Sequence, residues 1–244
     1  MTFEGIFRDI RNMLWPQRCV FCSSLIFENE KYTCERCLDS LPFVRENICF
    51  GCASEKKYCT CSGNIHYYDK AVSPLYYEGA VKKAVKKLKY KKKKEYASAF
   101  ASYMTDALEK YLSDEKFDFI ACVPLHAKDR RKRGYNQSEM IAEVLSEKTG
   151  IPFERDVLTK LYRTKKQTSG DYNERTGNVF GAFSLGENAD VSNCSVLLVD
   201  DVKTTGSTLS ECGKMLFLGG AQRVCCVSTA TSAYGKRKNK EVKK

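Results

Sequence analysis

The sequence predicts an α/β protein with a parallel sheet, preceded by a small cysteine-rich module. From Phe117 onward, short apolar runs alternate with helical patterns, which is typical of strands and crossover helices in one sheet. One of these runs ends in two acids and a loop rich in hydroxyl groups. Before them, eight cysteines lie in close pairs between Cys19 and Cys61. We therefore expect a metal-binding module over residues 1–66, a sheet domain over 67–234 and a basic tail over 235–244.

The composition fits a folded protein with two unequal parts. The chain has 244 residues, of which 43% are hydrophobic and 29% are charged. No apolar stretch approaches the roughly 20 residues of a membrane-spanning helix, and charged residues interrupt the first 15 positions, unlike a signal peptide. Closely paired cysteines without an export signal indicate reduced thiols and a cytoplasmic protein. The net charge of +11 makes polyanions plausible partners.

The cysteine pairs predict structural zinc. Four thiolates in two CxxC pairs suit one tetrahedral ion, and a second set, which ends in a CxC pair, suits another. A site closed by four thiolates has no open position for a substrate, so the metal stabilises the module. The spacing leaves open whether one or two ions bind and whether pairs cross between the sets. The ligands are Cys19, Cys22, Cys34 and Cys37, followed by Cys49, Cys52, Cys59 and Cys61.

A strongly basic helix is predicted over residues 80–94. Val81, Ala84, Val85 and Leu88 recur at helical spacing, and lysines occupy the other positions. Such a face binds a nucleic-acid backbone or is simply solvated. Tyr90 adds an aromatic ring for stacking on a base. The candidate DNA-binding residues are Lys82, Lys83, Lys86, Lys87, Lys89, Lys91 and Lys92.

The following elements are read from their periodicity and end signals. A helix with a core-facing side covers Tyr96 to Leu112, and a buried strand covers Phe117 to Val123. Asn136 to Glu139 resembles a capping box that opens a helix. Further strands are expected over 157–162, 179–185, 195–200 and 223–229, and a helix over 207–218 ends at two glycines.

The segment from Val196 to Thr208 carries the most specific signal. It places an apolar strand, an acid pair and a glycine-containing loop before a helix, where backbone N–H groups meet a phosphate. The carboxylates of Asp200 and Asp201 would repel that phosphate, so we assign them to a vicinal diol. An ordinary capped turn is the alternative. A ribose 5-phosphate fits both features, with the phosphate held by Thr204, Thr205, Gly206, Ser207 and Thr208.

Two further polar segments precede this loop in the sequence. Residues 128–133 are a basic cluster after the first strand, suited to pyrophosphate or to solvent. Residues 163–178 form either a mobile lid or a solvated connection. We assign the pyrophosphate and lid side to Leu125, His126, Arg133, Gln167 and Arg175.

Residues Val196 to Thr208 resemble the signature of the type I phosphoribosyltransferases. The resemblance implies that the acid pair holds the ribose hydroxyls of 5-phosphoribosyl-1-pyrophosphate, that the loop holds its 5-phosphate, and that Mg²⁺ accompanies the pyrophosphate. With the segments Leu88 to Tyr90 and Arg133 to Gln137, the polar loop and the cysteine pairs, nearly the whole chain resembles the ComF (ComFC) family of competence proteins.

That family implies a cytoplasmic protein at the DNA-uptake machinery, which supports uptake of single-stranded DNA in natural transformation beside a helicase-like partner, ComFA. Two functions stay open. In one, the chain binds single-stranded DNA and uses the phosphoribosyl site for a ligand. In the other, it is an active Mg²⁺-dependent phosphoribosyltransferase whose acceptor is unknown.

Overall fold

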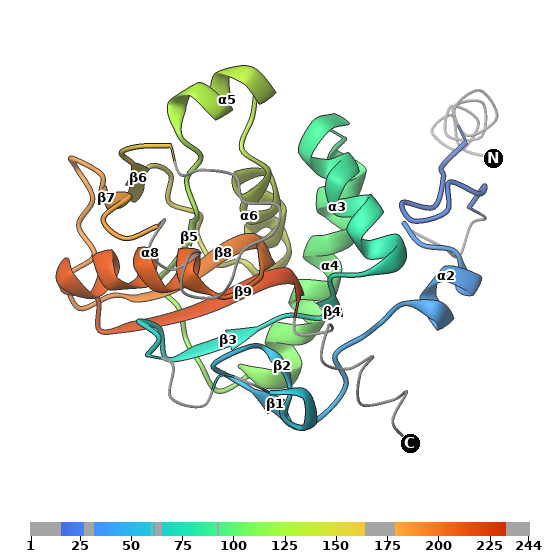
Figure 1. Cartoon of the computed structure of the whole chain (residues 1–244), viewed down its shortest axis with the longest axis horizontal. Coiled ribbons are helices and arrows are strands. Elements are labelled where there is room, and N and C mark those ends of the chain that lie inside the picture. The colour runs from blue at the N-terminus through green and yellow to red at the C-terminus, as the bar shows by residue number, and fades with distance from the viewer. Residues whose placement is uncertain are drawn as a thin grey trace, which may run out of the picture.

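A sheet with a row of four parallel strands forms the centre of the molecule (Figure 1). The computed structural model describes residues 16–26, 32–59, 61, 65–91, 93–163 and 179–232. The strand order is β3-β9-β8-β5, and each neighbouring pair is parallel. A further short strand, β4 (Leu75–Tyr76), also pairs with β9. The bounds are β3 Lys70–Val72, β5 Phe119–Cys122, β8 Ser195–Lys203 and β9 Arg223–Thr231.

Helices cover both faces of this sheet, because its strands are apolar on both sides. On β8, Leu197 and Val199 belong to one core cluster, whereas Val196 and Leu198 belong to the other. The first cluster lies under three helices and the second under α8 (Ser207–Leu218). The three helices are α3 (Gly79–Lys91), α4 (Lys94–Tyr111) and α6 (Gln137–Thr149).

Most of the expected elements are confirmed. The predicted apolar face of α3 is fully buried at Val81, Ala84, Val85 and Leu88. Asn136 caps α6, because its side chain accepts a hydrogen bond from the Ser138 backbone N–H. The strand expected over 195–200 continues to residue 203, and the acid pair is therefore held within regular β-structure.

Three parts of the fold differ from the sequence predictions. The strands expected around 157–162 and 179–185 are β6 (Leu158–Lys160) and β7 (Phe183–Leu185), and they pair antiparallel with each other outside the parallel sheet. The basic segment after β5 folds as a short helix, α5 (Ala127–Arg133). Strands β3 and β4 were not predicted, because two or three residues are too few to show a period.

The cysteine-rich module packs directly on the sheet domain. It contains α2 (Glu35–Ser40), β1 (Ile48–Cys49), β2 (Ser54–Glu55) and a short 3-10 helix, Lys56–Tyr58. The ring of Phe21 meets Phe100 of α4 edge-on at 6.2 Å, and Tyr58 meets Tyr76 of β4 at 6.4 Å. Because these residues share one core cluster, the module and the sheet domain stabilise each other. Within the described ranges, no helix has the length and hydrophobicity to cross a membrane.

Candidate functional site

The acid pair lies buried on β8. Asp200 and Asp201 are 8% and 5% exposed. The Ser138 hydroxyl, at the start of α6, donates to Asp200 Oδ1 at 3.1 Å, and the Asp201 backbone N–H donates to the same oxygen at 2.8 Å. Burial and the neighbouring Asp201 carboxylate raise the pKa of Asp200 to about 7. The pair is therefore held ready to accept hydrogen bonds at a fixed position.

Lys89 of the basic helix reaches the acid pair. Its Nζ lies 2.6 Å from Asp201 Oδ2, and its side chain is 26% exposed. Burial alone would lower the pKa of Lys89, but Asp201 outweighs it and the pKa is raised. The sequence analysis grouped Lys89 with the candidate DNA-binding lysines, whereas the structure turns it inward to a carboxylate. Helical spacing places Lys82, Lys86 and Lys89 on one face, so the sequence pattern did not indicate this contact.

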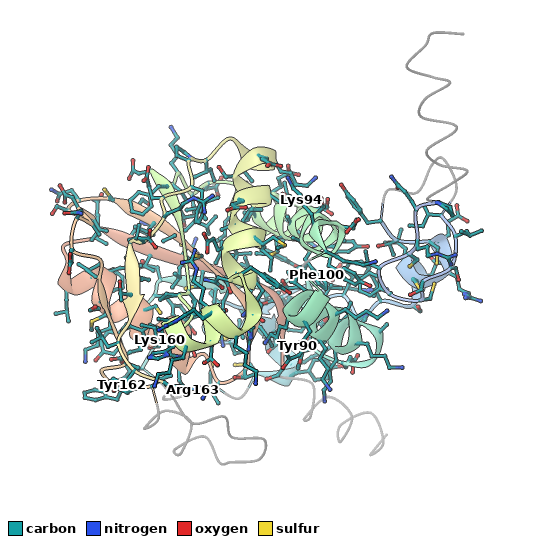
Figure 2. The ribbon with its side chains drawn as sticks, turned by 90° about the horizontal axis from the view of Figure 1, so that it is seen from above. Tyr90, Lys94, Phe100, Lys160, Tyr162 and Arg163 are labelled. Atoms are coloured by element: carbon teal, nitrogen blue, oxygen red, sulfur yellow. The ribbon has the colours of Figure 1, made fainter. Side chains whose placement is uncertain are left out.

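Two separate sequence segments meet behind the acid pair. The Tyr135 hydroxyl donates to the Leu88 backbone oxygen, and the Arg133 guanidinium lies over the Tyr90 ring, 5.8 Å from its centre. In Figure 2, Tyr90 projects from α3 toward the same edge of the molecule as Arg163, which follows β6. The segments Leu88 to Tyr90 and Arg133 to Gln137 therefore contact each other on both sides of Lys89 in the sequence.

The loop after the acid pair has the geometry of an anion site. Gly206 has φ +84°, a conformation that favours glycine, and it directly precedes α8. The Thr205 and Ser207 hydroxyls lie 2.7 Å apart. Gly206 has no side chain that could cap α8. The Thr205 hydroxyl accepts a hydrogen bond from the Ser207 backbone N–H at 3.3 Å. The helix start therefore offers backbone N–H groups to a phosphate.

The expected pyrophosphate side is only partly described. His126 is the N-cap of α5, and its Nδ1 accepts from the Lys128 backbone N–H at 3.2 Å. Arg133 donates to Gln137 Oε1 at 2.8 Å, and Leu125 lines a small cavity beside β5. Gln167, Arg175, Lys92 and the Lys91 side chain lie outside the described residues. The role of this side in binding pyrophosphate stays a prediction.

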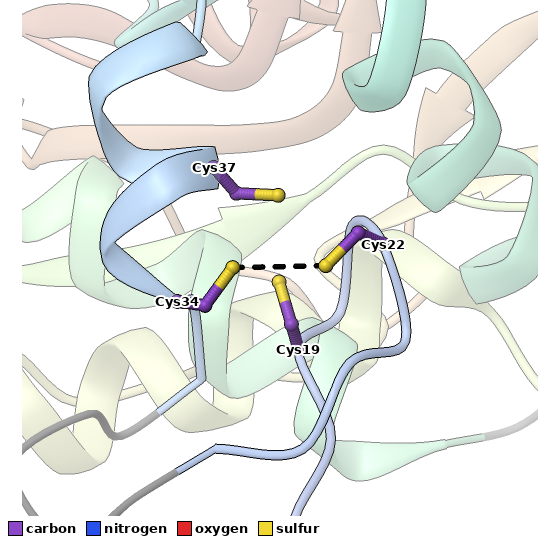
Figure 3. Close-up of side chains that lie close together, drawn as sticks. All are labelled: Cys19, Cys22, Cys34 and Cys37. Atoms are coloured by element: carbon purple, nitrogen blue, oxygen red, sulfur yellow. Dashed lines mark hydrogen bonds between the residues drawn. The ribbon is translucent and has the colours of Figure 1, made fainter.

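The first cysteine tetrad fits one zinc ion. Cys19, Cys22, Cys34 and Cys37 point their sulfurs toward one another (Figure 3), and all four sulfurs lie within 4.8 Å. Cys22 Sγ and Cys34 Sγ are 3.6 Å apart, close to the ~3.8 Å edge of a zinc tetrathiolate with Zn–S bonds of ~2.3 Å. A hydrogen bond with the Ser24 side chain is the main cause that lowers the pKa of Cys22 to about 6. A thiolate is the form that zinc requires.

The second tetrad also brings its four sulfurs within 4.8 Å. Cys61 Sγ lies 3.4 Å from Cys49 Sγ and 3.3 Å from Cys59 Sγ, and Cys52 completes the set. Burial acts to raise the pKa of Cys49, but hydrogen bonds from the Cys52 backbone and from neighbouring thiols lower it to about 7. The pairs therefore do not cross between the sets, and the final CxC pair closes the second one.

The outer face of α3 keeps fewer free lysines than the sequence suggested. Lys82, Lys83 and Lys86 are exposed. Lys87 is half-buried, and its Nζ donates to Ser23 Oγ at 3.3 Å, in the loop of the first tetrad. The helix thus contacts the cysteine module on one side and the acid pair, through Lys89, on the other.

Two residues of the site, Ser138 and Lys203, were not predicted from the sequence. Ser138 has no motif of its own, and its role depends on α6 starting beside β8. Lys203 lies two residues after Asp201 on the same strand and is only 2% exposed. Its Nζ lies next to Gly206 at the start of α8, and a lysine directly after an apolar strand was the available signal.

Comparisons with known proteins support the assignment of the cysteine module as zinc-binding, and they find relatives that are similar over most of the chain. A family model described as a double zinc ribbon domain matches residues 10–68. Competence protein F of Haemophilus influenzae is 26% identical over 215 residues, which cover 79% of this chain and 94% of that protein. DNA utilization protein YhgH of Salmonella typhi is 29% identical over 163 residues, which cover 64% of this chain and 70% of that protein.

Among solved structures, the match with the glutamine phosphoribosylpyrophosphate amidotransferase of B. subtilis has 24% identity and a TM-score of 0.39. It covers 59% of this chain and 30% of that one.

Proposed function

We propose that this chain, which is 26% identical to competence protein F of Haemophilus influenzae over 79% of its length, belongs to the same family, binds 5-phosphoribosyl-1-pyrophosphate and single-stranded DNA, and supports DNA uptake in natural transformation. One observation carries the phosphoribosyl part. A buried carboxylate pair lies on a central parallel strand, directly before a left-handed glycine and a helix start. This order puts diol acceptors and phosphate donors next to each other.

The acid pair would hold the ribose. Asp201 lies 2.6 Å from Lys89 Nζ, and Asp200 is fixed by the Ser138 hydroxyl, so both present carboxyl oxygens in set directions. The Lys89 ammonium also offsets the repulsion between two adjacent carboxylates. The ligand's hydroxyls thus meet acceptors that need no rearrangement, which reduces the entropic cost of binding.

The phosphate groups would lie on either side of the ribose. The 5-phosphate takes the N–H groups and hydroxyls from Thr204 to Thr208. The pyrophosphate would lie beside Leu125, His126 and Arg133. Mg²⁺ would accompany the pyrophosphate and neutralise part of its charge.

DNA would bind along the outer face of α3. Lys82, Lys83 and Lys86 are exposed on successive turns, and the Tyr90 ring is 69% exposed. Lysines at this spacing contact backbone phosphates, and an exposed tyrosine stacks on a base. Because Lys89 of the same helix reaches Asp201, the DNA surface and the phosphoribosyl site share one rigid element. We place the protein in the cytoplasm at the uptake machinery, beside a ComFA-like helicase.

Calorimetry with 5-phosphoribosyl-1-pyrophosphate and Mg²⁺ tests the pocket. We expect the wild-type chain to bind and the Asp200→Asn/Asp201→Asn variant to lose at least about tenfold in affinity, because two acceptors for the ribose are weakened. Asp190→Asn is the matched control, since this aspartate caps an exposed turn at Ser192. Equal affinity in the wild type and the double variant would overturn the assignment. Release of pyrophosphate in the presence of bases would identify an active transferase.

A further inference from the structure

We infer that the second cysteine tetrad lies directly behind the phosphate loop, Thr204 to Thr208, and that Lys203 connects the tetrad with the loop. Zinc bound at Cys49, Cys52, Cys59 and Cys61 then sets the affinity of the loop for phosphate. The inference rests on the proposed function and deepens it. It assigns to one of the two zinc sites a role in ligand binding in addition to holding the module together.

A short chain of contacts connects the loop to the tetrad. A methyl group added at Gly206 would lie 3.0 Å from Lys203 Nζ and 3.1 Å from the Tyr68 hydroxyl, so both groups pack against the backbone of the loop. The Tyr68 hydroxyl donates to the Gly51 backbone oxygen at 2.6 Å. Gly51 lies between Cys49 and Cys52, in the turn that presents two of the four thiols.

The other side of that turn faces the remaining ligands. A methyl group added at Gly51 would lie 3.1 Å from Cys61 Sγ and 3.3 Å from His66 Cδ2. The His66 ring stacks on Tyr68 with centres 5.0 Å apart. Within the described residues, His66 Nε2 is buried without a hydrogen-bond partner. A ring nitrogen in this position suits a neighbouring thiolate of a zinc-loaded tetrad, because ligating sulfurs accept outer hydrogen bonds.

The turn is also fixed to the sheet. The Thr231 hydroxyl on β9 donates to the Cys52 backbone oxygen at 3.0 Å, and the Ala71 N–H on β3 donates to the Phe50 oxygen at 2.7 Å. The turn that carries Cys49 and Cys52 is therefore fixed to β3 and β9, and β9 pairs with β8, which carries the acid pair. In Figure 1, β1 and β2 lie beneath β3, at the sheet itself.

Lys203 supplies the charge that links the two sites. Its side chain is 2% exposed, and burial lowers the pKa of Lys203, whereas the thiolates of Cys52, Cys61 and Cys49 act to raise it. A zinc ion bound by four thiolates carries a net charge of about −2, which favours a buried cation beside it. The same ammonium borders Gly206, where the phosphate is expected. One lysine thus stabilises the zinc centre and adds a positive charge behind the loop.

The first tetrad lies elsewhere and provides a control. Its residues pack on α3 and α4, through Phe21 on Phe100 and Ser23 on Lys87. Figure 1 shows α2 beyond α3, on the opposite side of the molecule from α8. Loss of this zinc should loosen the module without changing the phosphate loop.

The test compares the full-length Cys59→Ser/Cys61→Ser variant with the Cys22→Ser/Cys34→Ser variant. Metal analysis counts the zinc, and calorimetry measures the affinity for 5-phosphoribosyl-1-pyrophosphate with Mg²⁺. We expect each variant to lose one zinc ion, but only the Cys59/Cys61 variant to lose about tenfold or more in ligand affinity. Equal affinities of the two variants overturn the inference. If the wild type does not bind the ligand at all, the proposed function fails instead.

A second variant covers the case in which the cysteine variants do not fold. Lys203→Met removes the charge and keeps the side-chain length. We expect Lys203→Met to lower the zinc affinity of the second tetrad by about 10–100-fold, as measured by competition with a chromophoric chelator. The affinity for the phosphoribosyl ligand should also fall, and Lys203→Arg should restore part of both affinities. Unchanged zinc affinity in Lys203→Met overturns the inference.

Discussion

The Asp200→Asn substitution should make the free energy of unfolding less sensitive to rising pH. Burial and Asp201 raise the pKa of Asp200 to about 7 from an ordinary value of 3.8. A carboxyl group whose pKa is raised by folding stabilises the folded state most at low pH, and this contribution is lost as the pH rises from about 4 to about 7. Asparagine keeps the oxygen that accepts from Ser138 but has no proton to lose.

The size of the effect follows from these two pKa values. Between pH 6 and pH 8 the wild type should lose about 1.4 kcal/mol of unfolding free energy relative to Asp200→Asn. For a chain of this length, that corresponds to about 3–6 °C in Tm.

Thermal denaturation of both zinc-loaded proteins at several pH values measures this difference, and the zinc contribution cancels because both carry the same tetrads. Asp190→Asn serves as the control, because a hydrogen bond from the Ser192 backbone lowers the pKa of that exposed aspartate and it stays ionised throughout this range. If the wild-type and Asp200→Asn curves run parallel from pH 6 to pH 8, the reasoning about the buried acid pair is wrong.

Three further predictions concern the loop, the basic helix and the metal. Gly206→Ala should cost about 1–2 kcal/mol of stability in urea denaturation, because a Cβ at φ +84° is strained and meets Lys203 Nζ; an unchanged midpoint contradicts this. Replacing Lys82, Lys83 and Lys86 by alanine should reduce the slope of log affinity against log salt concentration for single-stranded DNA by about 2. An unchanged slope would mean that these lysines face solvent and do not contact DNA. Chelation should release two zinc ions per chain and lower the Tm, as followed by circular dichroism; an unchanged Tm rules out structural zinc.

The sequence predicted the long elements and the two tetrads well. Strand β8 begins as a continuous apolar run and helix α8 lies between Gly206 and Gly219, so both elements were predicted, although β8 extends three residues beyond the expected end. The two tetrads follow from local spacing. Short pieces such as β3 and β4 gain their pairing from β9, which lies far away in the chain, and no local pattern reports that.

The contacts of the candidate site were less predictable, because they depend on distant residues. Lys89 shares a helical face with Lys82 and Lys86, and only its place near the C-terminal end of α3 brings it to Asp201. Lys203 appeared to be part of a loop, but the strand continues through it and buries its side chain. Likewise, the spacing of Cys49 to Cys61 predicted a metal site but not its position behind Gly206. These relations arise from the packing of the module on the sheet.

A crystal structure of the zinc-loaded protein with 5-phosphoribosyl-1-pyrophosphate and Mg²⁺ tests the central claim most directly. We expect the ribose hydroxyls within hydrogen-bond distance of Asp200 and Asp201, and the 5-phosphate on the backbone from Thr204 to Thr208. Density for the ligand at another place on the molecule, or an acid pair without ligand under saturating conditions, would contradict the account.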